Sequence, residues 1–346
     1  MAKESFLVIG AGAWGTALSI RLAKNGLSVT LTSKDKENLS VVKKTKENKK
    51  SLPGIKIPAS INIEEAIIPC LASSSCILVC VKSTAFKKTV VELSSHINDD
   101  QKLIWATKGL DPETGETFSE SIKRELPSLN KTAVISGPTF AEEVAEGKPT
   151  AITLASENIQ SLNDLSSIMS SSSFRVYTSN DIIGVQLGGA FKNIVAIAVG
   201  ASDALSLGAN ARTALISRGL EEMKSIGVAF GAKPETFFGL SGLGDLVLSS
   251  TDNQSRNRRL GLLVGSGMPL DKAIENLGTT PEGAHAVKAL YSNQDLHEGL
   301  PIASAVYSIL FEGVPAESLV EKLMTRPLKK NSKQNQRNQI VLLTRN

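Results

Sequence analysis

The chain contains little cysteine, histidine or aromatic residue. Its 346 residues include three cysteines, three histidines and only 4% aromatic residues. An odd number of cysteines in a chain this long does not indicate a disulfide framework. Cys76 and Cys80 lie in or beside the apolar run CILVCV, where a free cysteine behaves as a small hydrophobic residue. No Cys-x-x-Cys spacing occurs, and His96, His285 and His297 lie far apart, so the sequence predicts no metal site.

Long hydrophobic runs are also missing. No stretch approaches the roughly 18 apolar residues of a membrane-spanning helix. The N-terminal residues MAKESFLVIGAG contain glycines and a turn where a cleavable signal would need a continuous apolar segment. We therefore expect a cytoplasmic protein without an integral membrane segment.

The positive charge is mild and locally concentrated. The net charge is +4, and much of it lies in KKTKENKK (43–50) and in KKNSKQNQRNQ (329–339). Neither run carries interleaved aromatic residues on which bases could stack, so both predict solvated faces or flexible ends and no nucleic-acid partner. The first run could also attract an anionic ligand.

The first half of the chain alternates apolar strand-like runs with helical patterns. These runs are apolar throughout, which is typical of a parallel sheet covered on both faces. The pattern predicts a doubly wound α/β domain of the Rossmann type. The expected strands are FLVIGAG (6–12), SVTLTS (28–33), CILVCV (76–81), KLIWAT (102–107), TAVISGP (132–138) and TAITLAS (150–156).

The second half of the chain has a different sequence pattern. From about residue 182 long helical segments replace the strand-like runs, and after Pro327 the chain becomes rich in Asn, Gln and Lys. A length of 346 residues suggests about two domains at roughly 100–200 residues each. We predict an α/β domain over 1–181, an all-α domain over 182–327 and a weakly ordered polar tail over 328–346.

The stretch VIGAGAWGTAL follows a strand and opens a helix. Gly10, Gly12 and Gly15 form the pattern G-x-G-x-x-G, which permits a tight turn and a close approach of the backbone to a pyrophosphate. In this context the pattern predicts a dinucleotide site. The alternative is a glycine-rich turn without a ligand.

The end of the second strand bears on the choice between NAD and NADP. An acidic residue there binds the ribose 2′-hydroxyl, whereas a basic one accommodates a 2′-phosphate. The chain reads Ser33, Lys34 and Asp35 at this point. Lys34 slightly favours NADP, while Asp35 could cap the next helix or favour NAD.

Lys192 lies among small and apolar residues in the stretch GGAFKNIVAIAVG. Buried Lys192 needs a partner, a lowered pKa or a chemical role. Asp245 lies in a glycine-rich segment, and Ser255, Arg256 and Asn257 start a helical pattern that could cradle a phosphate. Together they suggest a phosphorylated alcohol, from which the lysine would take the hydroxyl proton during hydride transfer.

Each of these residues also has a structural interpretation. Lys192 could pair with a structural carboxylate or extend to the surface, and Asp245 could cap a helix. The arginines at 256–259 could form a solvated face. The glycine pattern in the same chain favours the catalytic interpretation.

Several longer stretches carry a resemblance to a known family. In chain order they are GAGAWGTAL, ATKGL, SGPTFAEEVAEGKPTA, GGAFKNIVAIAVG, NARTALISRGLEEM, GLSGLGDLVLSS and SRNRRLG, and they cover most of residues 5–310. The chain resembles the bacterial NAD(P)-dependent sn-glycerol-3-phosphate dehydrogenases. The resemblance implies reversible oxidation of sn-glycerol 3-phosphate to dihydroxyacetone phosphate. It also implies that the enzyme supplies glycerol phosphate for phospholipid synthesis, and it suggests a homodimer.

The resemblance also implies residue roles. Lys192 matches the proton acceptor, and Lys108 and Arg256 match residues that contact both substrate and cofactor. Other substrate positions match Gly137, Thr139, Asp245, Ser255 and Asn257. Other cofactor positions match Gly10, Gly12, Ala13, Trp14, Gly15, Lys34, Ala141, Thr280 and Glu282.

Three positions depart from the family pattern. Lys82 replaces a proline in the stretch VKS, which removes a fixed backbone angle and adds a charge near the expected nicotinamide site. Thr280 stands where an apolar residue is usual, and Lys34 where arginine or histidine is common. Two other functions stay open: a different β-hydroxyacid-type dehydrogenase, and a dinucleotide sensor without catalysis.

Overall fold

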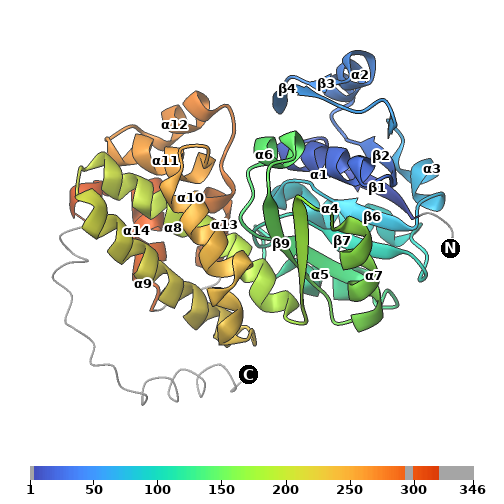
Figure 1. Ribbon diagram of the computed structural model, residues 1–346. Coiled ribbons are helices and arrows are strands. Elements are labelled where there is room, and N and C mark those ends of the chain that lie inside the picture. The colour runs from blue at the N-terminus through green and yellow to red at the C-terminus, as the bar shows by residue number, and fades with distance from the viewer. Residues whose placement is uncertain (1–3, 293–298, 319–346) are drawn as a thin grey trace.

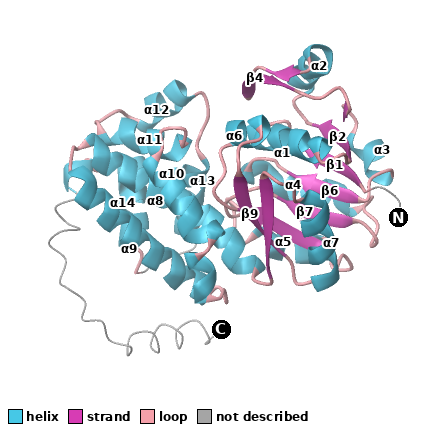
Figure 2. Ribbon diagram, in the orientation of Figure 1, coloured by secondary structure: helices cyan, strands magenta, loops and turns pink. Residues whose placement is uncertain are grey.

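The computed structural model describes residues 4–292 and 299–318, so the tail expected over 328–346 lies outside the described residues. An α/β layer structure is joined to a helical part that carries the C-terminal elements (Figure 1). Figure 2 shows that strands are confined to the first of these parts. The described residues thus have the predicted combination of an α/β part and an all-helical part.

The main sheet has eight strands in the order β10-β9-β8-β7-β6-β1-β2-β5. All neighbouring pairs are parallel except β8 and β9, which run antiparallel. The mostly parallel Rossmann-type sheet is therefore confirmed. The strands are β1 (Ser5–Ile9), β2 (Ser28–Thr32), β5 (Ile61–Ile63), β6 (Cys76–Val79), β7 (Lys102–Trp105), β8 (Thr132–Ser136), β9 (Thr150–Ala155) and β10 (Phe174–Ser179).

All six expected strands form, but the sequence pattern missed four others. The hairpin of β3 (Glu47–Asn48) and β4 (Leu52–Lys56) is short, and β4 contains a proline and a glycine that argue against a strand. Strand β5 has only three residues, and β10 is a largely exposed edge strand. Short or exposed strands lack the buried apolar run by which the others are recognised.

Alternation along each strand divides the core into two layers. In β1, Phe6 and Val8 pack on one face of the sheet, while Leu7 and Ile9 pack on the other. The first layer includes residues of α1 (Ala13–Lys24), α2 (Lys36–Thr45), α6 (Ala141–Glu146) and α7 (Ile159–Met169). The second includes residues of α3 (Ile67–Ala72), α4 (Ser83–Ser94) and α5 (Phe118–Glu125).

Helix α8 (Ile182–Ala204) is the central helix of the C-terminal part. The expectation that no stretch is apolar enough to cross a membrane was wrong for this helix, which passes by length and composition and is the single such helix in the described ranges. However, 89% of its most apolar window is buried inside the protein. This burial identifies α8 as a core helix. Around it lie α9 (Gly208–Ala229), η1 (Pro234–Phe238), η2 (Leu240–Gly244), α10 (Asp245–Thr251), α11 (Arg256–Gly265), α12 (Leu270–Leu277), α13 (Glu282–Ser292) and α14 (Pro301–Phe311).

The crossing of α8 and α11 depends on glycine. A Cβ placed on Gly261 would lie 2.0 Å from the carbonyl oxygen of Ile197 and 2.9 Å from the Cα of Gly200. The two backbones approach too closely for any larger side chain. This contact fixes the first residues of α11 relative to α8.

We expect Gly261→Ala to lower the free energy of unfolding by about 1–3 kcal/mol, because the new methyl group must push the helices apart. Urea denaturation measures the change. Arg259→Ala, at an exposed position of the same helix, serves as the control and should change stability by less than about 0.5 kcal/mol. Equal stability of Gly261→Ala and the wild type would contradict the close packing.

Candidate active site

Lys192 and Asp245 form a buried ion pair inside the helical part. The side chain of Lys192 is 9% exposed and that of Asp245 is 0% exposed. The Lys192 Nζ donates hydrogen bonds to Asp245 Oδ1 at 2.8 Å and to Ser249 Oγ at 2.6 Å. The lysine on the apolar helix therefore has the partner that its burial requires.

A second lysine reaches the same carboxylate from the sheet. Lys108 follows β7, and its Nζ donates to Asp245 Oδ2 at 2.5 Å and to the carbonyl oxygen of Gly137 at 3.1 Å. Each carboxylate oxygen of Asp245 thus binds one ammonium group. The cluster joins the α/β part to the helical part.

The charges of the cluster, together with burial, shift the pKa values of Lys192 and Asp245. Burial lowers the pKa of Lys192 from 10.5 to about 8, and the nearby positive charge of Lys108 adds to the effect, while Asp245 opposes it. Burial alone would raise the pKa of Asp245, but the two lysines outweigh it and hold that pKa below its usual range. At neutral pH Asp245 is therefore ionised, and Lys192 titrates near physiological pH.

Tight backbone packing places Asp245 beside α8. A Cβ on Gly188 of α8 would lie 2.5 Å from the carbonyl oxygen of Ser241 in the π-helical turn η2. The turn runs directly into α10, whose first residue is Asp245. Short π-helical turns occur frequently at functional sites, and this one aims a carboxylate at a buried lysine.

The expected phosphate cradle lies at the start of α11. Ser255 caps this helix, because its Oγ accepts a hydrogen bond from the Arg258 N–H at 3.3 Å. Arg256 is exposed, and its charge contributes to the lowered pKa of Lys192, so its electrostatic influence reaches the lysine. A helix N-terminus with a guanidinium group suits an anionic ligand.

The side chain of Asn257 mainly makes hydrogen bonds between helices. Its Nδ2 donates to Asn193 Oδ1 at 2.8 Å, and its Oδ1 accepts from the Gly283 N–H at 2.8 Å. These bonds tie α11 to α8 and to α13. Among the described residues the second N–H of this amide has no hydrogen-bond partner, so it is available to a ligand.

The glycine loop has the geometry of a dinucleotide site. Gly10 has φ of +118°, and a Cβ there would lie 2.6 Å from the carbonyl oxygen of Cys80. A Cβ on Gly15 would lie 2.0 Å from the carbonyl oxygen of Gly10, whereas Gly12 faces open space. The loop therefore packs closely on its inner side. The N-terminus of α1, which begins with Ala13 and Trp14, stays accessible to a pyrophosphate.

The end of β2 carries two ion pairs. Lys34 binds Glu92 at 2.5 Å, with both side chains well exposed. Asp35 caps α2 by accepting from the Asn38 N–H at 3.1 Å, and it also binds Lys50 at 2.6 Å. Of the two interpretations of Asp35, the structure shows the helix cap.

The remaining predicted cofactor residues lie at the ends of helices. Trp14 is the second residue of α1, Ala141 is the first residue of α6, and Thr280 precedes α13. The buried Nε1 of Trp14 makes no hydrogen bond within the described part of the chain. The carboxylate of Glu282 accepts from the N–H of Ser83 at 3.3 Å and from its Oγ at 2.5 Å.

Lys82 also makes a contact between the two parts of the chain. Its Nζ donates to Thr279 Oγ1 at 3.3 Å. This bond and the Ser83–Glu282 bonds join the start of α4 to the start of α13. The added lysine is thus accommodated beside the predicted cofactor residues.

The sequence pattern did not single out Ser249 or Asn193 as site residues. Ser249 stands four residues after Asp245 on the same helix face, a spacing that would have indicated it. Asn193 adjoins Lys192 but faces Asn257. Thr139, which was predicted, donates to the carbonyl oxygen of Gly137, next to the bond from Lys108.

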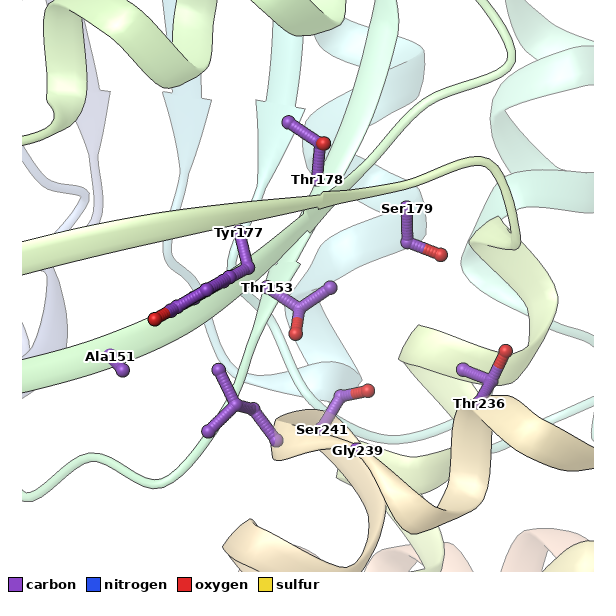
Figure 3. A pocket seen from close by; sticks show the side chains of 9 residues that line it. Ala151, Thr153, Tyr177, Thr178, Ser179, Thr236, Gly239 and Ser241 are labelled. Atoms are coloured by element: carbon purple, nitrogen blue, oxygen red, sulfur yellow. The ribbon is translucent and has the colours of Figure 1, made fainter.

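A separate hollow lies between the edge of the sheet and the η1–η2 segment (Figure 3). Its walls are mainly small and hydroxyl-bearing: Ala151, Thr153, Tyr177, Thr178, Ser179, Thr236, Gly239, Leu240 and Ser241. Ser241 belongs to the turn that leads to Asp245. Lys192 and Lys108 are not among the lining residues, so the hollow is distinct from the charged cluster.

Comparison with known proteins covers nearly the whole chain. The family described as NAD-dependent glycerol-3-phosphate dehydrogenase N-terminus matches residues 5–162, and its C-terminus counterpart matches residues 181–321. The chain belongs to this family. A glycerol-3-phosphate dehydrogenase [NAD(P)+] of Vibrio vulnificus is 44% identical over 331 residues, covering 95% of this chain and 96% of the relative.

A solved structure agrees with this family membership. The glycerol-3-phosphate dehydrogenase of Coxiella burnetii superimposes with a TM-score of 0.89 at 39% sequence identity. The match covers 94% of this chain and 99% of that one. The family resemblance carried by the motifs is confirmed.

Proposed function

We propose that the protein interconverts sn-glycerol 3-phosphate and dihydroxyacetone phosphate with NAD or NADP. The observation that carries this proposal is the buried Lys192–Asp245–Lys108 cluster beside a helix N-terminus bearing Arg256. It combines a group that titrates near neutral pH with cations that suit a phosphate. Dehydrogenation of a phosphorylated alcohol requires both.

The residues at the glycine loop fit a dinucleotide. The close contacts of Gly10 and Gly15 and the open space at Gly12 leave backbone N–H groups available at the start of α1. When bound, the nicotinamide accepts or donates the hydride. Lys34, Ala141, Thr280 and Glu282 are the further residues proposed to hold the cofactor, with Lys34 slightly favouring NADP.

Lys192 moves the proton in this proposal. In oxidation the neutral amine accepts the proton of the substrate hydroxyl, and in reduction the ammonium returns one to the carbonyl oxygen. Asp245 keeps the Nζ in place through its 2.8 Å bond. The Lys108 Nζ donates a hydrogen bond to the Gly137 carbonyl oxygen. Together with Thr139, these two residues orient the reacting end of the substrate.

The phosphate would lie at the start of α11. Arg256 supplies a guanidinium group, and Ser255 and Asn257 supply short polar side chains. The positive charges of Lys192, Lys108 and Arg256 explain why an anionic substrate would be attracted to the cluster. Dihydroxyacetone phosphate should therefore react much faster than dihydroxyacetone.

The direct test follows the oxidation of NADH and of NADPH by the purified protein with dihydroxyacetone phosphate. Turnover that disappears with dihydroxyacetone would support the phosphorylated substrate, and the two rates would decide the cofactor. A different β-hydroxyacid-type dehydrogenase would turn over unphosphorylated acids instead. A sensor would bind the dinucleotide without turnover.

The lowered pKa of Lys192 predicts opposite pH profiles for the two directions. Since its pKa is about 8, the amine is mostly neutral above that pH and mostly protonated below it. We expect kcat/KM for sn-glycerol 3-phosphate to rise with pH and level off above about 8, and kcat/KM for dihydroxyacetone phosphate to fall above about 8. Initial rates in both directions from pH 6 to 10 would measure this, and parallel profiles would contradict it.

Several broader expectations belong to the same proposal. We propose a boundary between a cofactor domain (1–181) and a substrate domain (182–327), a homodimer, and a cytoplasmic enzyme that supplies phospholipid synthesis. We expect neither a nucleic-acid partner nor an integral membrane segment. Light scattering on the purified protein would test the dimer.

A further inference from the structure

Asn48 contradicts the expectation that the lysine-rich segment 43–50 is simply a solvated face. Its side chain is 0% exposed, although Lys49 and Lys50 beside it are exposed. The Nδ2 of Asn48 donates to the carbonyl oxygen of Ala11 at 2.9 Å and to Thr16 Oγ1 at 2.9 Å. A side chain 37 residues away in sequence thus binds the glycine loop directly.

The hairpin that carries Asn48 is firmly held. Leu52 and Ile57 belong to the hydrophobic core beneath it. Lys50 binds Asp35, so the hairpin is also joined to the end of β2. Figure 1 shows β3 and β4 beside α2, above the layer of α1 and β2. The buried amide is therefore held by core packing beneath the hairpin and by an ion pair at its edge, and it is not a mobile surface group.

The bond to Ala11 determines the direction of the next peptide N–H. The peptide group between Ala11 and Gly12 is planar and trans, so its carbonyl oxygen and its N–H point in opposite directions. Since Asn48 holds the carbonyl on the buried side, the N–H of Gly12 points away from the core. Gly12 is exposed and has open space where a Cβ would be, so this N–H faces the accessible side of the loop.

The second bond extends the effect to the helix. Thr16 is fully buried at the end of the first turn of α1, and its N–H donates to the Gly12 carbonyl oxygen at 3.0 Å. Asn48 therefore binds both the loop before the helix and the helix itself. It fixes the angle at which the chain enters α1, whose free N–H groups are suited to an anion.

We infer that Asn48 is a positioning residue of the dinucleotide site, which holds the Ala11–Gly12 peptide so that its N–H is directed at the diphosphate of the cofactor. This inference rests on the proposed function. It assigns to the hairpin 47–56 a role in cofactor binding that its lysine-rich sequence does not indicate. Asn48 itself does not touch the cofactor.

Two substitutions test the role. Asn48→Asp keeps the shape but replaces the donor with a carboxylate that repels the Ala11 carbonyl, and Asn48→Ala removes the contact without adding charge. We expect the Kd for NADH, measured by fluorescence titration, to rise about tenfold in Asn48→Ala and further in Asn48→Asp. The KM for dihydroxyacetone phosphate at saturating cofactor should change by less than about threefold.

The dependence on the diphosphate separates positioning from a structural role. ADP-ribose contains the diphosphate, and AMP lacks it. We expect Asn48→Ala to weaken inhibition by ADP-ribose about as much as it weakens NADH binding, and to leave inhibition by AMP within about threefold of the wild type. Equal losses for AMP and ADP-ribose would overturn the inference in favour of a general loosening of the domain.

Asn25→Ala is the matched control. The Asn25 Nδ2 donates to the carbonyl oxygen of Met169 at 2.8 Å, so it joins the other end of α1 to the end of α7. This control should lose stability without a change in the Kd for NADH. If both Asn48 variants bind NADH as tightly as the wild type, the inference is wrong, whereas a wild type that binds neither NADH nor NADPH would refute the proposed function instead.

Discussion

Replacing Lys192 by methionine is expected to lower kcat about 10²–10⁴-fold in both directions, which is the usual contribution of a positioned general acid or base. Methionine has a similar length and fills the apolar surroundings, but it cannot exchange a proton. Asp245 keeps one cation, because its other oxygen binds Lys108 at 2.5 Å. The fold and the glycine loop should therefore survive the change, and NADH should still bind.

Lys192→Arg distinguishes proton transfer from simple attraction between charges. An arginine keeps a positive charge beside Asp245, but its guanidinium does not lose a proton in proteins. We expect this variant to be nearly as inactive as Lys192→Met. Stopped-flow measurement of NADH oxidation, with NADH affinity as a control for folding, checks both variants. A kcat within about tenfold of the wild type in Lys192→Arg would rule out the proton-transfer role.

Asp245→Asn is expected to affect both stability and activity strongly. The carboxylate is completely buried between two ammonium groups, so removing its charge leaves both without a counterion. Breaking a buried ion pair by removing one partner typically costs about 3–5 kcal/mol. We expect a loss of that order in the free energy of unfolding at pH 7, and at least about a 10²-fold loss in kcat/KM.

The loss in the free energy of unfolding of Asp245→Asn should become smaller as the pH rises. In the wild type Asp245 raises the pKa of Lys192, so its removal lowers that pKa further below the value of an unfolded chain. The unfolded state then binds more protons than the native state over a wider range, and stability rises with pH. Urea denaturation at pH 7 and pH 9 should therefore show a smaller deficit at pH 9.

Asp203→Asn provides the matched control for this variant. Asp203 binds Arg212 and Arg258 in the same helical part, with its side chain only 6% exposed, but it does not touch the charged cluster. It should lose stability while kcat stays within about threefold of the wild type. If Asp245→Asn lost no more activity than this control, the carboxylate would be a structural group.

Local sequence patterns were sufficient to predict the general fold of the chain. The apolar strand runs such as CILVCV and the glycines of VIGAGAWGTAL are local patterns, so they predicted the sheet and the loop that the structure contains. A lysine on an apolar helix likewise indicated a buried ammonium in need of a partner. Burial, turn geometry and helix periodicity act over a few residues, which is why they are readable in sequence.

The contacts between residues far apart in sequence could be identified only from the folded structure. Lys108 lies 137 positions before Asp245, and Asn48 lies 37 positions after Ala11, yet each pair is bonded. Ser83 and Glu282 are 199 positions apart and still share two hydrogen bonds. Such pairs form because packing of the sheet against helices brings distant backbone segments together, and no local periodicity records that distance. The protonation of Lys192 and the direction of the Gly12 N–H therefore follow from long-range packing, not from the motifs that contain them.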